Sequence, residues 1–110
     1  MSKREPELLL DDSRTAISKI HRYIAGLEGD SFLTDDKTID AVVRNLEVVG
    51  EAVKQSPIEF KRQHAMIPWS QIAGLRNRIV HDYAGIDLEL VWQILKTALP
   101  EFSRQISELK

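Results

Sequence analysis

The segment "GLRNRIVHDY", residues 74–83, concentrates side chains that could act on a phosphate group. It contains Arg76, Asn77 and His81, in a chain with three histidines and no cysteine. Histidine titrates near neutral pH, so it can take a proton from a ribose 2′-hydroxyl or give one to a leaving oxygen. Arginine can grip a phosphate through two hydrogen bonds and stabilise the charge that builds on it. These residue types suit metal-free cleavage of a phosphodiester bond, with Asn77 orienting the imidazole or donating to the phosphate.

The spacing of these residues raises a geometric difficulty. On a regular helix Asn77 and His81 form an i,i+4 pair, and Tyr83 lies about 20° from Arg76. Arg76 and His81 are separated by about 140°, so one chain does not easily aim both at one atom. Either the helix unwinds near His81, or a second copy of the chain supplies the missing half.

A structural interpretation of the same segment is also open. Arg76 and Asp82 would make surface ion pairs, while His81 packs against the next helix. For an isolated Arg-x4-His pattern this interpretation is favoured, because the pattern is short and common.

The elements that must position these residues are expected to be helices. Apolar residues recur at helical spacing, and no run alternates as a strand does. The last helix has Asp87 as its cap, and Pro100 should kink or divide it. The sequence therefore predicts one domain, residues 1–110, folded as an all-α antiparallel bundle of four main helices. The expected helices are one from about Pro6 to about Leu27, one that begins near Thr34, a short piece at Pro57–Gln63, one from Pro68 through Tyr83, and the last after Asp87.

The second helix carries a polar stripe opposite its apolar face. Its residues recur at spacings of 4, 3, 4 and 3: Asp40, Arg44, Glu47, Glu51 and Lys54. Taken alone, such a stripe is typical of a solvated face with i,i+4 charge pairs.

Composition excludes several classes of protein. The net charge of −2 argues against bulk electrostatic binding to nucleic acid, but a few placed cations can still hold one phosphate. The apolar runs are too short to span a membrane, and the N-terminus lacks the apolar core of a secretory signal, so we expect a cytoplasmic protein.

His21 and His64 have no partner at ligand spacing, so we expect no metal site and no cofactor. Trp69 and Trp92 are interpreted as core or interface anchors.

Three segments resemble the HepT family of HEPN-domain proteins. They are "AVVRNLEVVGEAVK", "IPWSQIAGLRNRIVHDYAGID" and "VWQILKTALP". The family signature, Arg-x4-His-x-Tyr, is matched in full by Arg76, His81 and Tyr83. The similarity extends from around Leu8 to Pro100.

The resemblance implies a four-to-five-helix bundle that forms a homodimer and brings two copies of the motif together in a cleft. It also implies a metal-independent endoribonuclease toxin that cleaves RNA and is encoded beside a minimal nucleotidyltransferase antitoxin. In such systems the antitoxin can transfer AMP to the motif tyrosine, here Tyr83. A bulky anionic nucleotide there would fill the cleft and repel RNA phosphates.

The resemblance extends to the second helix through Arg44, Asn45 and Glu51. These residues either line the cleft, with Arg44 on RNA and Glu51 paired with an arginine, or make structural ion pairs. Arg78 is interpreted as a solvated neighbour or an RNA contact rather than a catalyst.

Two hypotheses remain at this point. In the first the chain is a nuclease that uses Arg76, His81 and Asn77, with Tyr83 as a regulatory hydroxyl. In the second it is a binding module that docks a nucleotidyltransferase and cleaves nothing, which the acidic charge and sparse basic surface favour.

Overall fold

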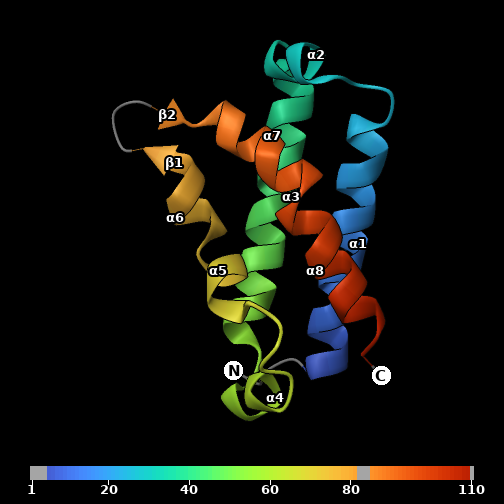
Figure 1. Cartoon of the computed structure of the whole chain (residues 1–110), viewed down its shortest axis with the longest axis vertical. Helices are drawn as coiled ribbons and strands as arrows, with labels where there is room; N and C mark the ends of the chain where they lie inside the picture. The colour runs from blue at the N-terminus through green and yellow to red at the C-terminus, as the bar shows by residue number, and fades with distance from the viewer. Residues whose placement is uncertain (1–4, 82–84, 110) are drawn as a thin grey trace.

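The computed structural model describes residues 5–81 and 85–109, and of His81 only the backbone. The described part is a bundle of helices with one small pair of strands (Figure 1). This agrees with the predicted all-α class. The helices are α1 (Pro6–Ile24), α2 (Gly29–Leu33), α3 (Asp36–Gln55), α4 (Ile58–Gln63), α5 (Trp69–Ala73), α6 (Leu75–Ile79), α7 (Leu88–Lys96) and α8 (Ala98–Ser107).

Helix α3 is the centre of the bundle and packs along α1 (Figure 1). Helices α7 and α8 cross the pair on one side, while α5 and α6 lie against α3 on another. Because apolar residues recur every three or four positions, each long helix buries one face and leaves the other in solvent. The core side chains with no exposed surface are Ile20, Phe32, Val42, Val49, Leu75, Ile79, Val91 and Leu99.

The ends of the first two long helices differ from the prediction. Helix α1 stops at Ile24 rather than near Leu27, and the short helix α2 follows, which the sequence did not predict. The cap of α3 is Asp35, whose carboxylate accepts a hydrogen bond from the Thr38 N–H at 3.1 Å. Thr34 instead closes α2, with its hydroxyl near the carbonyl oxygens of Asp30 and Ser31.

The C-terminal helices follow the prediction closely. Asp87 caps α7, because its carboxylate accepts from the Leu90 N–H at 3.1 Å. The helix is then interrupted at Thr97, which separates α7 from α8. Pro100 explains the break, since a proline has no N–H to donate and its ring collides with the carbonyl four residues earlier, that of Lys96.

The predicted third helix, from Pro68 through Tyr83, is wrong in its extent. It is interrupted at Gly74 between α5 and α6, and α6 ends at Ile79. Strand β1 (Val80–His81) then pairs antiparallel with β2 (Gly85–Ile86), with Val80 opposite Ile86 and His81 opposite Gly85. The prediction that no segment is a strand is therefore also wrong. The helix therefore unwinds before His81, so the separation of about 140° expected on a regular helix does not describe Arg76 and His81.

Within residues 5–81 and 85–109, no helix has the length and apolarity needed to cross a membrane.

Candidate active site

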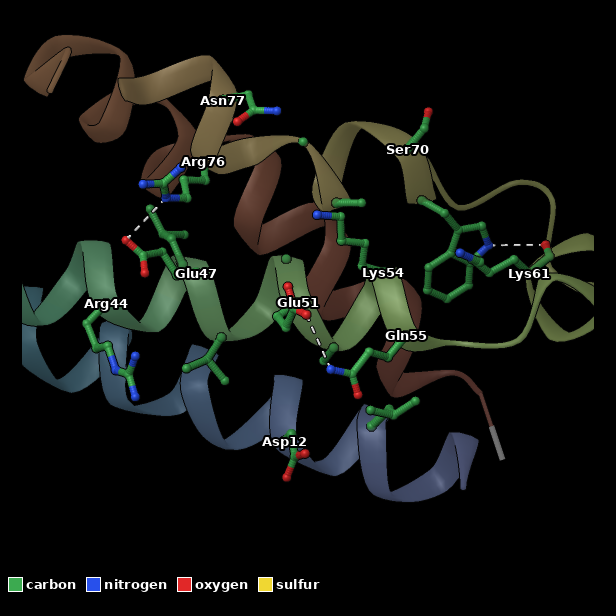
Figure 2. Close-up of a pocket in the computed structure, with 18 of the residues that line it drawn as sticks. Asp12, Arg44, Glu47, Glu51, Lys54, Gln55, Lys61, Ser70, Arg76 and Asn77 are labelled. Carbon is green, nitrogen blue, oxygen red and sulfur yellow. Dashed lines mark hydrogen bonds and ion pairs between the residues drawn. The ribbon is translucent and has the colours of Figure 1, made fainter. Parts of the chain in front are cut away.

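A groove of about 970 Å³ runs along the solvent side of α3. Helix α1 forms one wall, and α5 and α6 form the other (Figure 2). Its apolar lining includes Leu9, Val48, Ala52 and Trp69. Its charged and polar lining includes Asp12, Arg44, Glu47, Glu51, Lys54, Arg76 and Asn77. The residues of the predicted polar stripe therefore line the groove, except Asp40.

Arg76 reaches across the groove to α3, where its Nε lies 3.9 Å from Oε1 of Glu47 (Figure 2). The Arg76 side chain is 62% exposed and that of Glu47 is 39% exposed. An ion pair this exposed contributes little to stability, because water screens it. The guanidinium lies at the groove and stays accessible to an anionic ligand.

The position of Arg76 follows from the burial of its neighbours. Leu75 and Ile79 of α6 are completely buried, and their four-residue spacing fixes one face of this short helix to the core. Arg76 follows Leu75 by one position, so it emerges at the edge of that face beside α3. The packing of Leu75 and Ile79 in the core therefore fixes the position of the Arg76 backbone beside α3.

The second-helix residues separate into two groups. Arg44 and Glu51 line the groove, but Glu51 accepts a hydrogen bond from Gln55 at 3.3 Å rather than pairing with an arginine. Asn45 donates to the Ala41 carbonyl of its own helix at 2.8 Å, so its amide is directed along α3. Glu47, one turn before Glu51, is the carboxylate that meets Arg76.

The motif residues after Arg76 lie on different elements. Asn77 lies at the rim of the groove on α6 (Figure 2). His81 lies beyond the end of α6, on β1. Asn77 and His81 therefore do not form an i,i+4 pair on one regular helix, because α6 ends at Ile79 between them. Arg78 is exposed and does not line the groove. Tyr83, the expected site of modification, lies outside the described residues.

Backbone hydrogen bonds, rather than helix geometry, hold the His81 main chain. His81 pairs with Gly85, whose φ of +84° is in the left-handed region that glycine adopts readily. Just beyond the strand pair, the Asp87 N–H donates to the Ile79 carbonyl at 2.7 Å. Since Asp87 also caps α7, the end of α6 is tied directly to the start of α7.

Glu47 was not among the site residues predicted from the sequence. Its place in the polar stripe was visible, but the helical period does not show which carboxylate of the stripe faces another helix. The same holds for Lys54, which lines the groove between Arg76 and Lys61 in the view of Figure 2.

His64 and the two tryptophans have structural surroundings, whereas His21 is exposed on α1. The His64 ring lies 4.9 Å from that of Phe60, and the Trp69 indole donates to the carbonyls of Lys61 and His64 at 3.1 and 3.0 Å. Trp92 stacks on Phe32 at 5.1 Å. No group of three or more His, Cys, Asp or Glu residues within the described ranges is arranged to hold a metal ion.

The fold and this groove define a helical bundle that presents an arginine beside an open, partly charged surface. Residues 14–109 match the family model described as "Ribonuclease HepT-like". The chain therefore belongs to the HepT-like family of the HEPN superfamily.

Curated relatives of similar length support this assignment. A Thermococcus cleftensis protein named "Probable ribonuclease HepT" is 36% identical over 98% of both chains. Two others are named as candidate RNases. One, from Methanocaldococcus jannaschii, is 36% identical over 99% of this chain and 90% of its own. The other, from Caldanaerobacter subterraneus, is 36% identical over 78% of this chain and 77% of its own. The comparison with solved structures gave no significant match.

Proposed function

We propose that this chain is a metal-independent endoribonuclease that acts in the cytoplasm as a single HEPN domain. The observation that carries the proposal is Arg76, held at an open groove by Glu47 and more than half exposed. Membership of a ribonuclease family and the full Arg-x4-His-x-Tyr signature support it.

In the proposed reaction Arg76 binds the scissile phosphate and His81 moves the proton. An imidazole takes the proton of the ribose 2′-hydroxyl, and the 2′-oxygen attacks phosphorus. The bond from phosphorus to the 5′-oxygen breaks, and that oxygen gains a proton from an imidazolium. The products are a 2′,3′-cyclic phosphate end and a 5′-hydroxyl end. Arg76 stabilises the extra negative charge on the phosphate oxygens in the transition state, with Asn77 as a further donor.

We propose that the active site is completed by a second copy of the chain. Arg76 is directed across the groove toward α3, whereas His81 lies past the end of α6 on a different element. A homodimer that joins two motifs in one cleft would bring the arginine of one protomer to the histidine of the other. Arg44 and Glu51, which line the groove, would then face the same cleft.

Cleavage of RNA in excess EDTA by purified protein tests this function. Arg76→Ala and His81→Ala should each lower kcat/KM by at least about 100-fold, the range for a lost phosphate contact or general acid–base. Arg78→Ala, which removes an exposed arginine that does not line the groove, is the matched control and should retain activity. Equal activity in all four proteins would indicate a contaminant and overturn the assignment.

Mixing the two inactive variants tests the composite site. Arg76→Ala and His81→Ala protomers that exchange partners should form a dimer with one intact site and recover part of the activity. No recovery, in a mixture shown by mass spectrometry to contain heterodimers, would place both residues of a site on one chain.

We further propose that the protein is the toxin of a toxin–antitoxin pair and that a minimal nucleotidyltransferase antitoxin inhibits it. The Tyr83 oxygen would bond to the α-phosphorus of ATP, lose its proton and release pyrophosphate. The added nucleotide carries negative charge next to the phosphate-binding arginine and would compete with RNA. Incubation with the antitoxin and ATP should add one AMP to the wild-type chain and none to Tyr83→Phe. Modification elsewhere, or none, would contradict this part of the proposal.

A further inference from the structure

Helices α3 and α5 come into close contact at Gly50. A β-carbon at this position would lie 3.3 Å from the carbonyl oxygen of Ile72 and 3.5 Å from that of Ala73. Both neighbours are main-chain atoms, which cannot rotate away as the end of a side chain can. The absence of a side chain at Gly50 therefore lets the C-terminal end of α5 rest directly on α3.

This contact lies one helical turn from the Arg76–Glu47 pair. Glu47 precedes Gly50 by three positions, so both are on the face of α3 that meets α5 and α6. The chain passes from Ala73 through Gly74 into α6, which carries Arg76. Where α5 ends against α3 thus fixes the gap that Arg76 must span to Glu47, now 3.9 Å between Nε and Oε1 (Figure 2).

We propose that Gly50 and Glu47 are positioning residues for Arg76. Gly50 sets the distance between α3 and the segment that carries the arginine, and Glu47 sets the direction of its guanidinium. The inference rests on the proposed function, in which Arg76 contacts the RNA phosphate. A long, exposed arginine loses catalytic effect if it must be ordered anew in each turnover, so preorganisation by α3 raises the rate.

One carboxylate elsewhere on α3 serves as a control for the loss of charge, and two substitutions at Gly50 test the contact itself. Glu51 lines the same groove one turn away and accepts from Gln55, so Glu51→Gln removes the same charge without touching Arg76. Gly50→Ala adds one methyl group and Gly50→Val adds a larger, branched side chain. The valine variant should therefore displace α5 from α3 further than the alanine variant. Circular dichroism and thermal unfolding show which variants keep the fold.

The first measurement is independent of nuclease activity. The Arg76 Nε–Hε signal in 15N–1H spectra should exchange with water more slowly than that of exposed Arg78. In Glu47→Gln and Gly50→Val the two rates should become similar, while Glu51→Gln should resemble the wild type. An Arg76 signal unchanged in Glu47→Gln would overturn the proposal, whether or not the wild type cleaves RNA.

The second measurement is RNA cleavage by the same folded variants. Glu47→Gln and Gly50→Ala should lower kcat by about tenfold with a smaller change in KM, since a displaced catalytic group acts mainly on the transition state. Asp40→Asn, which removes an exposed carboxylate of α3 that does not line the groove, should stay within about twofold of the wild type. Full activity in Glu47→Gln with altered Arg76 exchange would refute a positioning role. An inactive wild type would instead refute the proposed function and leave the exchange result valid.

Discussion

Arg76 and His81 belong to one short segment, yet the fold holds them by different means. Arg76 stands on a helix whose other face, Leu75 and Ile79, is completely buried. The His81 main chain is held by strand pairing with Gly85, at the edge of the bundle. One half of the motif is therefore fixed by side-chain packing, and the main chain of the other is held by backbone hydrogen bonds to a strand that begins at a glycine with positive φ. Substitutions that damage one kind of support should leave the other largely intact.

The largest effect on stability is expected in the core that supports α6, the helix that carries Arg76. Leu75→Ala removes a fully buried side chain and should lower the free energy of unfolding by about 3 kcal/mol. Urea unfolding measures the loss. Leu8→Ala, at a leucine that is 44% exposed, is the control and should cost much less. Equal losses in the two variants would contradict the role given to the core beneath α6.

A smaller effect on stability is expected at Gly85, in the strand that pairs with His81. Gly85 has φ +84°, and among the described residues no atom lies within 4 Å of the position that its β-carbon would take, so an added methyl group meets backbone strain but no clash with them. Gly85→Ala should destabilise the protein by about 1–2 kcal/mol. Gly85→Asn should cost less, because asparagine tolerates this conformation better. An alanine variant as stable as the wild type would mean that the strand pair does not constrain His81.

Loss of the Asp87 cap of α7 should lower the free energy of unfolding by a smaller amount still. Asp87→Ala removes the acceptor for the Leu90 N–H and should lower the free energy of unfolding by about 1 kcal/mol. Asp87→Asn keeps a capping oxygen and should lose only a fraction of that. Thermal unfolding distinguishes the two, and identical behaviour of both variants would contradict the capping role.

The smallest effect concerns the other helix cap, Asp35, and depends on pH. The hydrogen bond from the Thr38 backbone N–H lowers the pKa of Asp35 below its ordinary value of 3.8. Because the folded pKa is lowered, the carboxylate stabilises the protein above the unfolded pKa and loses this effect as pH falls through the folded pKa. The difference in Tm between wild type and Asp35→Asn should therefore be larger at neutral pH than well below pH 3.8. A difference that is constant across this range would contradict the assignment.

The same contrast explains what could be predicted from the sequence. The long helices were predicted because α1 and α3 repeat their apolar residues over many turns, and Asp87 and Pro100 mark local boundaries by their own chemistry. The two-residue strands were missed because a segment that short has no period to detect. Their pairing depends on contact between residues 80–81 and residues 85–86.

The site was predicted in its residues but not in its arrangement. Arg76 and Arg44 were identified, and both line the groove. The partner of Arg76 was not, because the choice between Glu47 and Glu51 depends on where α6 crosses α3. Gly50 could not be interpreted from the sequence either, since its effect comes from carbonyl groups of another helix.

The chemical ends of the RNA products test the central claim most directly. Unmodified protein incubated with a defined RNA in EDTA should leave 2′,3′-cyclic phosphate and 5′-hydroxyl ends, and His81→Ala should leave none. This result would follow from attack by the 2′-hydroxyl with histidine as the proton carrier. Products with 5′-phosphate and 3′-hydroxyl ends, or cleavage that requires a divalent cation, would contradict a metal-independent nuclease built on Arg76 and His81.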